Sequence, residues 1–134
     1  MFTGIISGLG PIVGRQKRGQ FVVLQIDLAK YELNLGDSVA CDGICLTVSK
    51  VLVAGVCEFE VSVETVNCTN IQFWQVGYCC NIELAMVFGA RVDGHFVSGH
   101  VDGVVEVASV VDTAGGVNLQ VSYSSNDARW VRKG

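Results

Sequence analysis

The amino-acid sequence predicts an all-β chain whose strands close into a barrel. Three observations favour this fold class: the apolar runs are rich in Val and Ile and often alternate with polar residues, the chain has 16 glycines and one proline, and turn signals separate the runs at short intervals. Short strands with hairpin turns and few helices are typical of a closed barrel, because closure leaves no free strand edges.

Turn signals set the boundaries of eight predicted strands. A glycine-bounded basic stretch at 14–19 predicts a hairpin tip, Ala54-Gly55 predicts a tight hairpin, and Asp112–Gly116 predicts another. The predicted strands are Gly10–Arg15, Gln20–Asp27, Ser38–Cys41, Cys45–Val53, Val56–Val63, Cys79–Leu84, Gly103–Val111 and Val117–Tyr123. Two short helices are predicted between strands, at Leu28–Asn34 and at Thr65–Trp74, with Gly77 as the stop signal of the second.

Length and charge limit the classes of protein. The 134 residues are 50% hydrophobic and 16% charged, which suffices for one sizeable core. A net charge of −4 and a pI near 5.0 argue against nucleic-acid binding, which needs a basic face. No apolar run is long enough to cross a membrane, and the start shows neither a basic leader segment nor a cleavage site. We therefore expect a cytoplasmic protein that binds neither nucleic acid nor membrane.

Six cysteines are predicted to be free, mostly buried thiols. No Cys-x-x-Cys pair occurs, Cys79 and Cys80 are adjacent, and most of the cysteines lie among Val, Ile and Leu. This pattern argues against disulfides and against a zinc site, and no metal site is predicted.

Residues repeat at a spacing of 95, which predicts a duplicated module. The matches are Thr3-Gly4 with Ser98-Gly99, Ile6 with Val101, Gly8 with Gly103, Ile12 with Val107, and Leu24-Gln25-Ile26 with Leu119-Gln120-Val121. The first copy is predicted at 1–90 and the second at 95–134. The second copy contains no counterpart of residues 37–84, and a barrel cannot close with half its strands, so this copy is expected to be incomplete.

Three short motifs are candidates for chemistry. His95 and His100 are the only histidines, and one of them fixed by neighbouring glycines is a candidate proton carrier, with a hydrogen-bonded structural role as the alternative. Cys45 and Thr47 are two residues apart and therefore on one face of a strand; by themselves they indicate a core thiol and a bonded hydroxyl. Glu64-Thr65 by itself indicates a helix start.

Taken together, the motifs resemble riboflavin synthases. The resemblance covers essentially the whole chain and rests on Met1-Phe2-Thr3-Gly4-Ile5-Ile6, Gly36-Asp37-Ser38-Val39, Gly43-Ile44-Cys45-Leu46-Thr47-Val48, Glu64-Thr65 with Thr69-Asn70, Asn81-Ile82-Glu83, and Gly94-His95 with Gly99-His100-Val101-Asp102-Gly103. It implies two similar six-stranded Greek-key barrels, each able to hold one 6,7-dimethyl-8-ribityllumazine, and no cofactor. The implied reaction moves a four-carbon unit between two lumazines and gives riboflavin and 5-amino-6-ribitylaminouracil.

The resemblance also implies roles for single residues. His100 is the expected proton-transfer group, and Cys45 and Thr47 are expected to polarise or hydrogen-bond the acceptor ring. The residues expected to bind substrate are Gly4, Ile5, Ile6, Cys45, Leu46, Thr47, Glu60, Val61, Ser62, Val63, Glu64, Thr65, Gly99, His100, Val101 and Lys133.

The resemblance implies assembly as well. It predicts a homotrimer, an association with lumazine synthase, and a productive site formed between the first barrel of one subunit and the second barrel of its neighbour. The second Gly-x-Ser-Leu-Thr and Glu-Thr motifs are absent from the sequence, so these 134 residues alone are expected to bind lumazine or riboflavin but to turn over poorly. A non-catalytic lumazine- or flavin-binding protein is the alternative.

Overall fold

The computed structural model of the chain describes residues 1–125, 127–129 and 131. The chain divides into two compact units, Met1–Val101 and Asp102–Gly134. In the described part of the chain no helix has the length and apolar character needed to cross a membrane.

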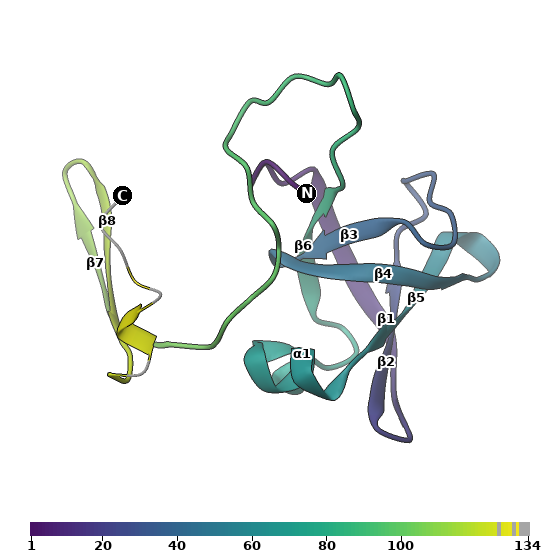
Figure 1. Ribbon diagram of the computed structural model, residues 1–134, viewed down its shortest axis with the longest axis horizontal. Helices are drawn as coiled ribbons and strands as arrows, with labels where there is room; N and C mark the ends of the chain where they lie inside the picture. The colour runs from purple at the N-terminus through teal and green to yellow at the C-terminus, as the bar shows by residue number, and fades with distance from the viewer. Residues whose placement is uncertain (126, 130, 132–134) are drawn as a thin grey trace. The chain divides into compact units, whose positions relative to one another are not determined.

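Six antiparallel strands close into a barrel in the first unit (Figure 1). The order around the barrel is β1-β2-β5-β4-β3-β6, and β6 pairs back onto β1. Because β2 pairs with β5 and not with β3, the chain follows a Greek-key path. The strands are β1 (Gly8–Arg18), β2 (Phe21–Asp27), β3 (Ser38–Cys41), β4 (Ile44–Val51), β5 (Val56–Val61) and β6 (Cys79–Leu84). The predicted all-β closed barrel is confirmed.

The first hairpin differs from the sequence prediction. Strand β1 continues through the basic stretch to Arg18, which pairs with Phe21, so the turn lies at 19–20 and not over 14–19. Gly19 adopts φ +62°, which a glycine tolerates without strain. The second tight turn lies where it was predicted: Ala54 and Gly55 both have positive φ between β4 and β5, in the short 3-10 turn η1 (Val53–Gly55).

The prediction of a helix at Leu28–Asn34 is wrong. Local hydrogen bonds and the burial of Leu28 in the core hold this segment in turns instead. The Asp27 carboxylate accepts the Ala29 N–H at 3.1 Å, and the Tyr31 N–H donates to the Leu28 carbonyl at 2.8 Å. Leu28 itself is buried in the barrel core, and its N–H donates to the Gly55 carbonyl. Such local side-chain bonds compete with a helical ladder.

The second predicted helix is broken into two pieces, α1 (Val63–Cys68) and η2 (Asn70–Phe73). Thr69 separates them with extended backbone, φ −134° and ψ 171°. Its hydroxyl donates to the Thr65 carbonyl at 2.6 Å and accepts the Ile71 N–H, so it satisfies groups that the break exposes. Ser62 caps the start of α1 by accepting the Thr65 N–H at 3.2 Å.

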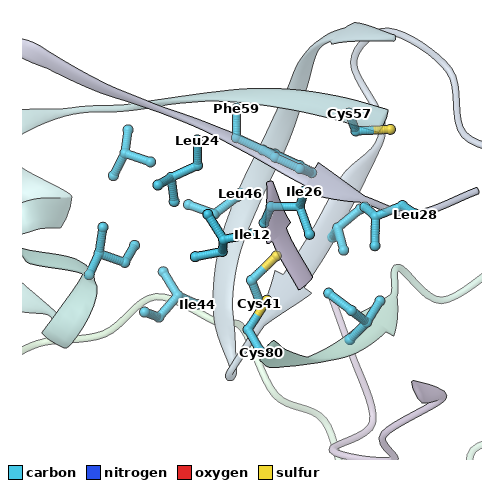
Figure 2. Packing of buried hydrophobic residues seen from close by; sticks show 14 of the residues in the cluster. Ile12, Leu24, Ile26, Leu28, Cys41, Ile44, Leu46, Cys57, Phe59 and Cys80 are labelled. Carbon is cyan, nitrogen blue, oxygen red and sulfur yellow. The ribbon is translucent and has the colours of Figure 1, made fainter. Parts of the chain in front are cut away.

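The core lies inside the barrel, where alternate residues of each strand point inward (Figure 2). Its members include Ile12 of β1, Leu24 and Ile26 of β2, Phe59 of β5 and Ile82 of β6. All six cysteines are free, as predicted, but only Cys41, Cys57 and Cys80 are buried; Cys45 and Cys68 are partly buried and Cys79 is exposed, so the expectation that most are buried is not met. The Cys41 and Cys80 thiols lie next to one another in Figure 2, and their hydrogen bond, together with burial, raises the pKa of Cys41. These thiols act as small apolar groups.

An ionic hydrogen-bond cluster joins the β3–β4 turn to the start of β6. The Asp42 carboxylate accepts the Tyr78 hydroxyl at 2.6 Å and both the backbone and side-chain N–H groups of Asn81 at 2.7 and 2.9 Å. The hydrogen bond to Asp42 raises the pKa of Tyr78 to about 12. This bond requires the protonated phenol, so its contribution to stability is present below pH 10, the ordinary tyrosine pKa, and is lost as the pH rises towards 12.

We therefore expect one tyrosine to ionise late in an alkaline titration followed by the ultraviolet absorbance of tyrosinate. Tyr78→Phe should remove this late step and flatten the pH dependence of stability above pH 10. The effect on stability is expected to be small because Tyr78 is 41% exposed and the bond is screened by solvent. Tyr123→Phe, which removes another exposed tyrosine, should leave the late step in place. A late step that persists in Tyr78→Phe would contradict this assignment.

The second unit contains the hairpin β7 (Glu106–Thr113) and β8 (Gly116–Ser122), followed by the short turn η3 (Asp127–Arg129). Its six register pairs from Val107–Val121 to Thr113–Gly116 are those of the β1–β2 hairpin displaced by 95 residues. The register shift between Ile12 and Gly14 also recurs between Val107 and Ser109. The β1–β2 and β7–β8 hairpins therefore have the same strand register and the same register shift.

Candidate functional site

Two chain segments pair with each other on the outside of the barrel. The N–H of Phe2 donates to the Val97 carbonyl at 2.8 Å, and the N–H of Val97 donates back to Phe2 at 3.0 Å. The N–H of His95 donates to the Thr3 carbonyl at 3.1 Å. We call residues 2–4 together with residues 94–101 the outer layer. Phe2 is 1% exposed yet lies outside the barrel core, so this layer buries apolar surface of its own.

A buried carboxylate attaches the N-terminal part of the outer layer to β6. Glu83 Oε1 accepts the Thr3 N–H at 2.6 Å and the Thr3 hydroxyl at 2.9 Å, and Glu83 Oε2 accepts the Gly4 N–H at 3.1 Å. Gly4 has φ +84°, a left-handed backbone that glycine adopts without strain.

Gly99 attaches the other part of the outer layer to β4. Its carbonyl accepts the Cys45 N–H at 2.8 Å. A Cβ at Gly99 would lie 2.9 Å from the Cys45 Cβ and 3.1 Å from the Phe2 ring, and φ is +76°. Only glycine fits this position without displacing its neighbours.

The outer layer crosses an edge of β4 that β5 does not cover. Pairing between β4 and β5 ends at Val48 and Phe59, whereas the β4 residues 44–47 pair on their other side with β3. Among the described residues, Gly99 is what bonds the Cys45 N–H at this edge. The start of β4 and the end of β5 are therefore not paired with each other, and unpaired strand-end backbone is a place where protein groups can meet a ligand.

The structure brings Gly4, Cys45 and Gly99 of the predicted site together within the outer layer and its contacts with β4. Ile5, Ile6, Thr47, His100 and Val101 are exposed. No hydrogen bond engages the Thr47 hydroxyl within the described residues. Thr47 is therefore available to a ligand, whereas Cys45 lies beneath Gly99.

Other predicted site residues have structural partners or lie inside the barrel. Leu46 and Val61 are core side chains, so only their backbone is able to meet a ligand. The Ser62 hydroxyl and the Thr65 N–H form the cap of α1. Glu60 accepts a hydrogen bond from Arg18 at 3.4 Å.

The remaining predictions fall on α1 and on the end of the chain. Val63 and Glu64 occupy the exposed first turn of α1. Lys133 lies outside the described residues.

The two histidines differ in position. The ring of His95 lies against Gly4, since its Cε1 is 3.9 Å from where a Gly4 Cβ would stand. The His100 side chain is exposed, and within the described residues it forms no hydrogen bond. No group of three or more metal-ligating side chains is assembled in the part of the chain that the structure describes.

Sequence reasoning missed Glu83 and Phe2 as parts of the site. In the sequence Glu83 stands out only as part of the Asn81-Ile82-Glu83 motif, and its contacts join residues 80 positions apart. The sequence places Glu83 on the outward face of a strand, next to the inward-facing Ile82; only the structure shows that it is 7% exposed and therefore needs hydrogen-bond donors. Two surface hollows, of about 320 and 270 Å³, are lined by other residues, such as Leu33 and Met86 in the first and Pro11 and Lys30 in the second.

The closed six-stranded Greek-key barrel, with an outer layer over the part of β4 that β5 does not cover, defines the class of protein as a small antiparallel β-barrel. The lumazine binding domain family matches residues 3–85, and the chain belongs to this family. Riboflavin synthases are similar to it: that of Photobacterium leiognathi is 39% identical over 125 residues, and that of Bacillus subtilis (strain 168) is 40% identical over 119. The resemblance to riboflavin synthases is confirmed.

The matches cover most of this chain but a smaller share of each relative. The matches span 91% and 87% of this chain but 57% and 55% of the two relatives, so the chain spans little more than half of their length. A solved structure of LumP complexed with 6,7-dimethyl-8-(1'-D-ribityl) lumazine shares the fold, with a TM-score of 0.80 at 22% identity over 94% of this chain and 71% of that one. A structure of LumP complexed with riboflavin gives a TM-score of 0.79 at the same identity, covering 94% of this chain and 69% of that one.

Proposed function

We propose that the first barrel binds 6,7-dimethyl-8-ribityllumazine at the outer layer and that the protein acts as a riboflavin synthase. The observation that carries the proposal is the outer layer itself, which joins Gly4, Cys45 and Gly99 beside the open edge of β4. Membership of the lumazine binding domain family and the similarity to riboflavin synthases support it.

The chain's own residues suggest how a lumazine would be held. Because the Cys45 N–H is already bonded to Gly99, the backbone of Thr47 and of 60–62 would read the pyrimidine edge of the ring, and the exposed Thr47 hydroxyl would donate to a ring or ribityl oxygen. Ile5 and Ile6 would cover the ring, since both are exposed apolar side chains next to the fixed Gly4. Cys45 would support this surface from beneath Gly99 and act through the position of its backbone.

The proposed reaction transfers a four-carbon unit between two lumazines, giving riboflavin and 5-amino-6-ribitylaminouracil. A methyl group of one lumazine must lose a proton while the other ring accepts a nucleophile. Holding the two rings face to face would supply most of the acceleration through proximity, and the protein contributes proton transfer through His100. No cofactor is required for this chemistry.

The second lumazine needs a second half-site, which we propose comes from a second barrel. The shared register of the β1–β2 and β7–β8 hairpins supports the duplication. Assembly as a homotrimer, association with lumazine synthase and a cytoplasmic location belong to the same proposal.

Titration of the 134-residue chain with 6,7-dimethyl-8-ribityllumazine, followed by ligand fluorescence, tests the binding part. We expect saturable binding of lumazine and of riboflavin, with little riboflavin formed on prolonged incubation. An absence of binding by both ligands would refute the proposal for this barrel. Brisk riboflavin formation would refute the need for a second half-site.

A non-catalytic binding protein is the second candidate, favoured by the shared fold with LumP in complexes with lumazine, riboflavin and flavin mononucleotide. Measuring whether riboflavin is formed distinguishes the two functions. A catalyst forms riboflavin once a second half-site is present, whereas an inactive binder holds lumazine unchanged.

We expect His100→Gln to slow turnover more than it weakens binding. In a form of the protein that has both half-sites and catalyses the reaction, kcat should fall at least tenfold because the proton carrier is lost. The Kd for lumazine should change less than threefold. His95→Gln is the matched control for losing a histidine, and its effect should fall mainly on binding because that ring lies against Gly4. Unchanged turnover in His100→Gln would remove His100 from the mechanism.

A further inference from the structure

We propose that Glu83 is the positioning residue of the lumazine site: it fixes the outer layer through Thr3 and Gly4 and does not touch the ligand. The inference rests on the proposed function of the barrel. It assigns a role in binding to a strand residue whose side chain is almost completely covered, at 7% exposed.

The carboxylate depends on the outer layer for its hydrogen bonds. Both of its oxygens accept from Thr3 and Gly4, through three donors at 2.6 to 3.1 Å. The ion pairs within the described residues join Arg18 or Arg91 to other carboxylates, so no cation neutralises Glu83 there. Undocking the N-terminal segment would leave a buried charge without partners or force its hydration, and this cost holds the segment in place.

The position of Thr3 is passed on to the rest of the outer layer by backbone hydrogen bonds. The Thr3 carbonyl accepts the His95 N–H, and Phe2 exchanges two hydrogen bonds with Val97. Two residues further along, the Gly99 carbonyl accepts the Cys45 N–H. One carboxylate on β6 therefore fixes a continuous path from the N-terminus to the open edge of β4.

This path matters for affinity because residues 1–7 lie outside the barrel strands, and such segments are mobile unless hydrogen bonds and packing hold them. Ile5 follows Gly4 directly, and His100 follows Gly99, so both proposed ligand contacts extend from fixed glycines. If the outer layer were mobile, each binding event would have to order it. The free-energy cost of that ordering would raise the Kd for the ligand.

Glu83→Gln tests the inference because the amide keeps the shape but loses the charge and one acceptor. Amide hydrogen exchange by NMR should become faster at Thr3, Gly4, His95 and Val97 while the core amides of β2 stay protected. The Kd for 6,7-dimethyl-8-ribityllumazine should rise about tenfold. Thr3→Val removes one donor without touching the barrel and should give a smaller change in the same direction.

Glu58→Gln is the matched control. Glu58 is also a buried glutamate, at 6% exposed, but its partners are Gln25 and Arg18, and it does not contact the outer layer. Its substitution should lower stability while leaving the Kd and the exchange of Thr3 and Gly4 unchanged.

The outcomes separate the inference from the proposed function. If wild type binds lumazine and Glu83→Gln frees the four amides without changing the Kd, the positioning role is overturned and the function stands. Unchanged exchange in both Glu83→Gln and Thr3→Val also overturns it. If wild type binds no lumazine, the proposed function fails first, whatever the exchange shows.

Discussion

Gly99→Ala is expected to detach residues 97–101 from β4 and to lower the affinity for lumazine by roughly a hundredfold. The added Cβ would lie 2.9 Å from the Cys45 Cβ and 3.1 Å from both the Cys45 N and the Phe2 ring, at a φ of +76°. The left-handed backbone costs an alanine about 1 kcal/mol, and the overlap adds about 1–3 kcal/mol. A change of about 3 kcal/mol in docking the segment corresponds to the stated loss.

Gly43→Ala is the matched control for this prediction. Gly43 has nearly the same backbone, φ +80°, but a Cβ there would meet open space. The control should therefore lose stability through backbone strain alone and keep its affinity. Fluorescence titration measures the Kd of both variants, and circular dichroism checks that the barrel remains folded. Equal loss of affinity in the two variants would show that contact with Cys45 is not what matters.

Phe59→Ala is expected to destabilise the barrel by about 3–5 kcal/mol. Phe59 is 0% exposed and belongs to the core cluster (Figure 2). Truncation to alanine removes the buried apolar surface of the ring and leaves a cavity between the strands. This is a large part of the 5–15 kcal/mol that typically holds a domain folded. Urea unfolding followed by circular dichroism gives the free energy of unfolding.

Phe73→Ala separates burial from the mere loss of an aromatic residue. Phe73 is 70% exposed in η2, and its substitution should change the free energy of unfolding by less than about 0.5 kcal/mol. A loss at Phe73 as large as the loss at Phe59 would contradict the packing described for the core.

The β-strands were predictable because each carries its signal locally. Val- and Ile-rich runs bounded by turn residues placed β3 and β6 at their observed bounds, and the Ala-Gly pair between two apolar runs placed the turn at Ala54-Gly55. The predicted helix at Leu28–Asn34 failed because Leu28 is held by the core and by Gly55, a partner distant in sequence. Thr69 broke the other predicted helix by bonding its own neighbours.

For the candidate site too, the sequence predicted which residues belong to it but not how they contact one another. Motifs predicted Gly4, Cys45, Thr47, Gly99 and His100 as members, but no local pattern shows that Gly99 rests on Cys45 or that Leu46 points into the core. Glu83 owes its role to Thr3 and Gly4, about 80 residues away along the chain.

The sequence by itself determined the all-β class, the strands and the family, because strand propensity, turn chemistry and motif order are properties of neighbouring residues. Only the tertiary structure decided which residues meet at the outer layer. Burial of Glu83 and the close approach of Gly99 to Cys45 join segments that are far apart in the sequence, and such contacts depend on the positions of entire strands.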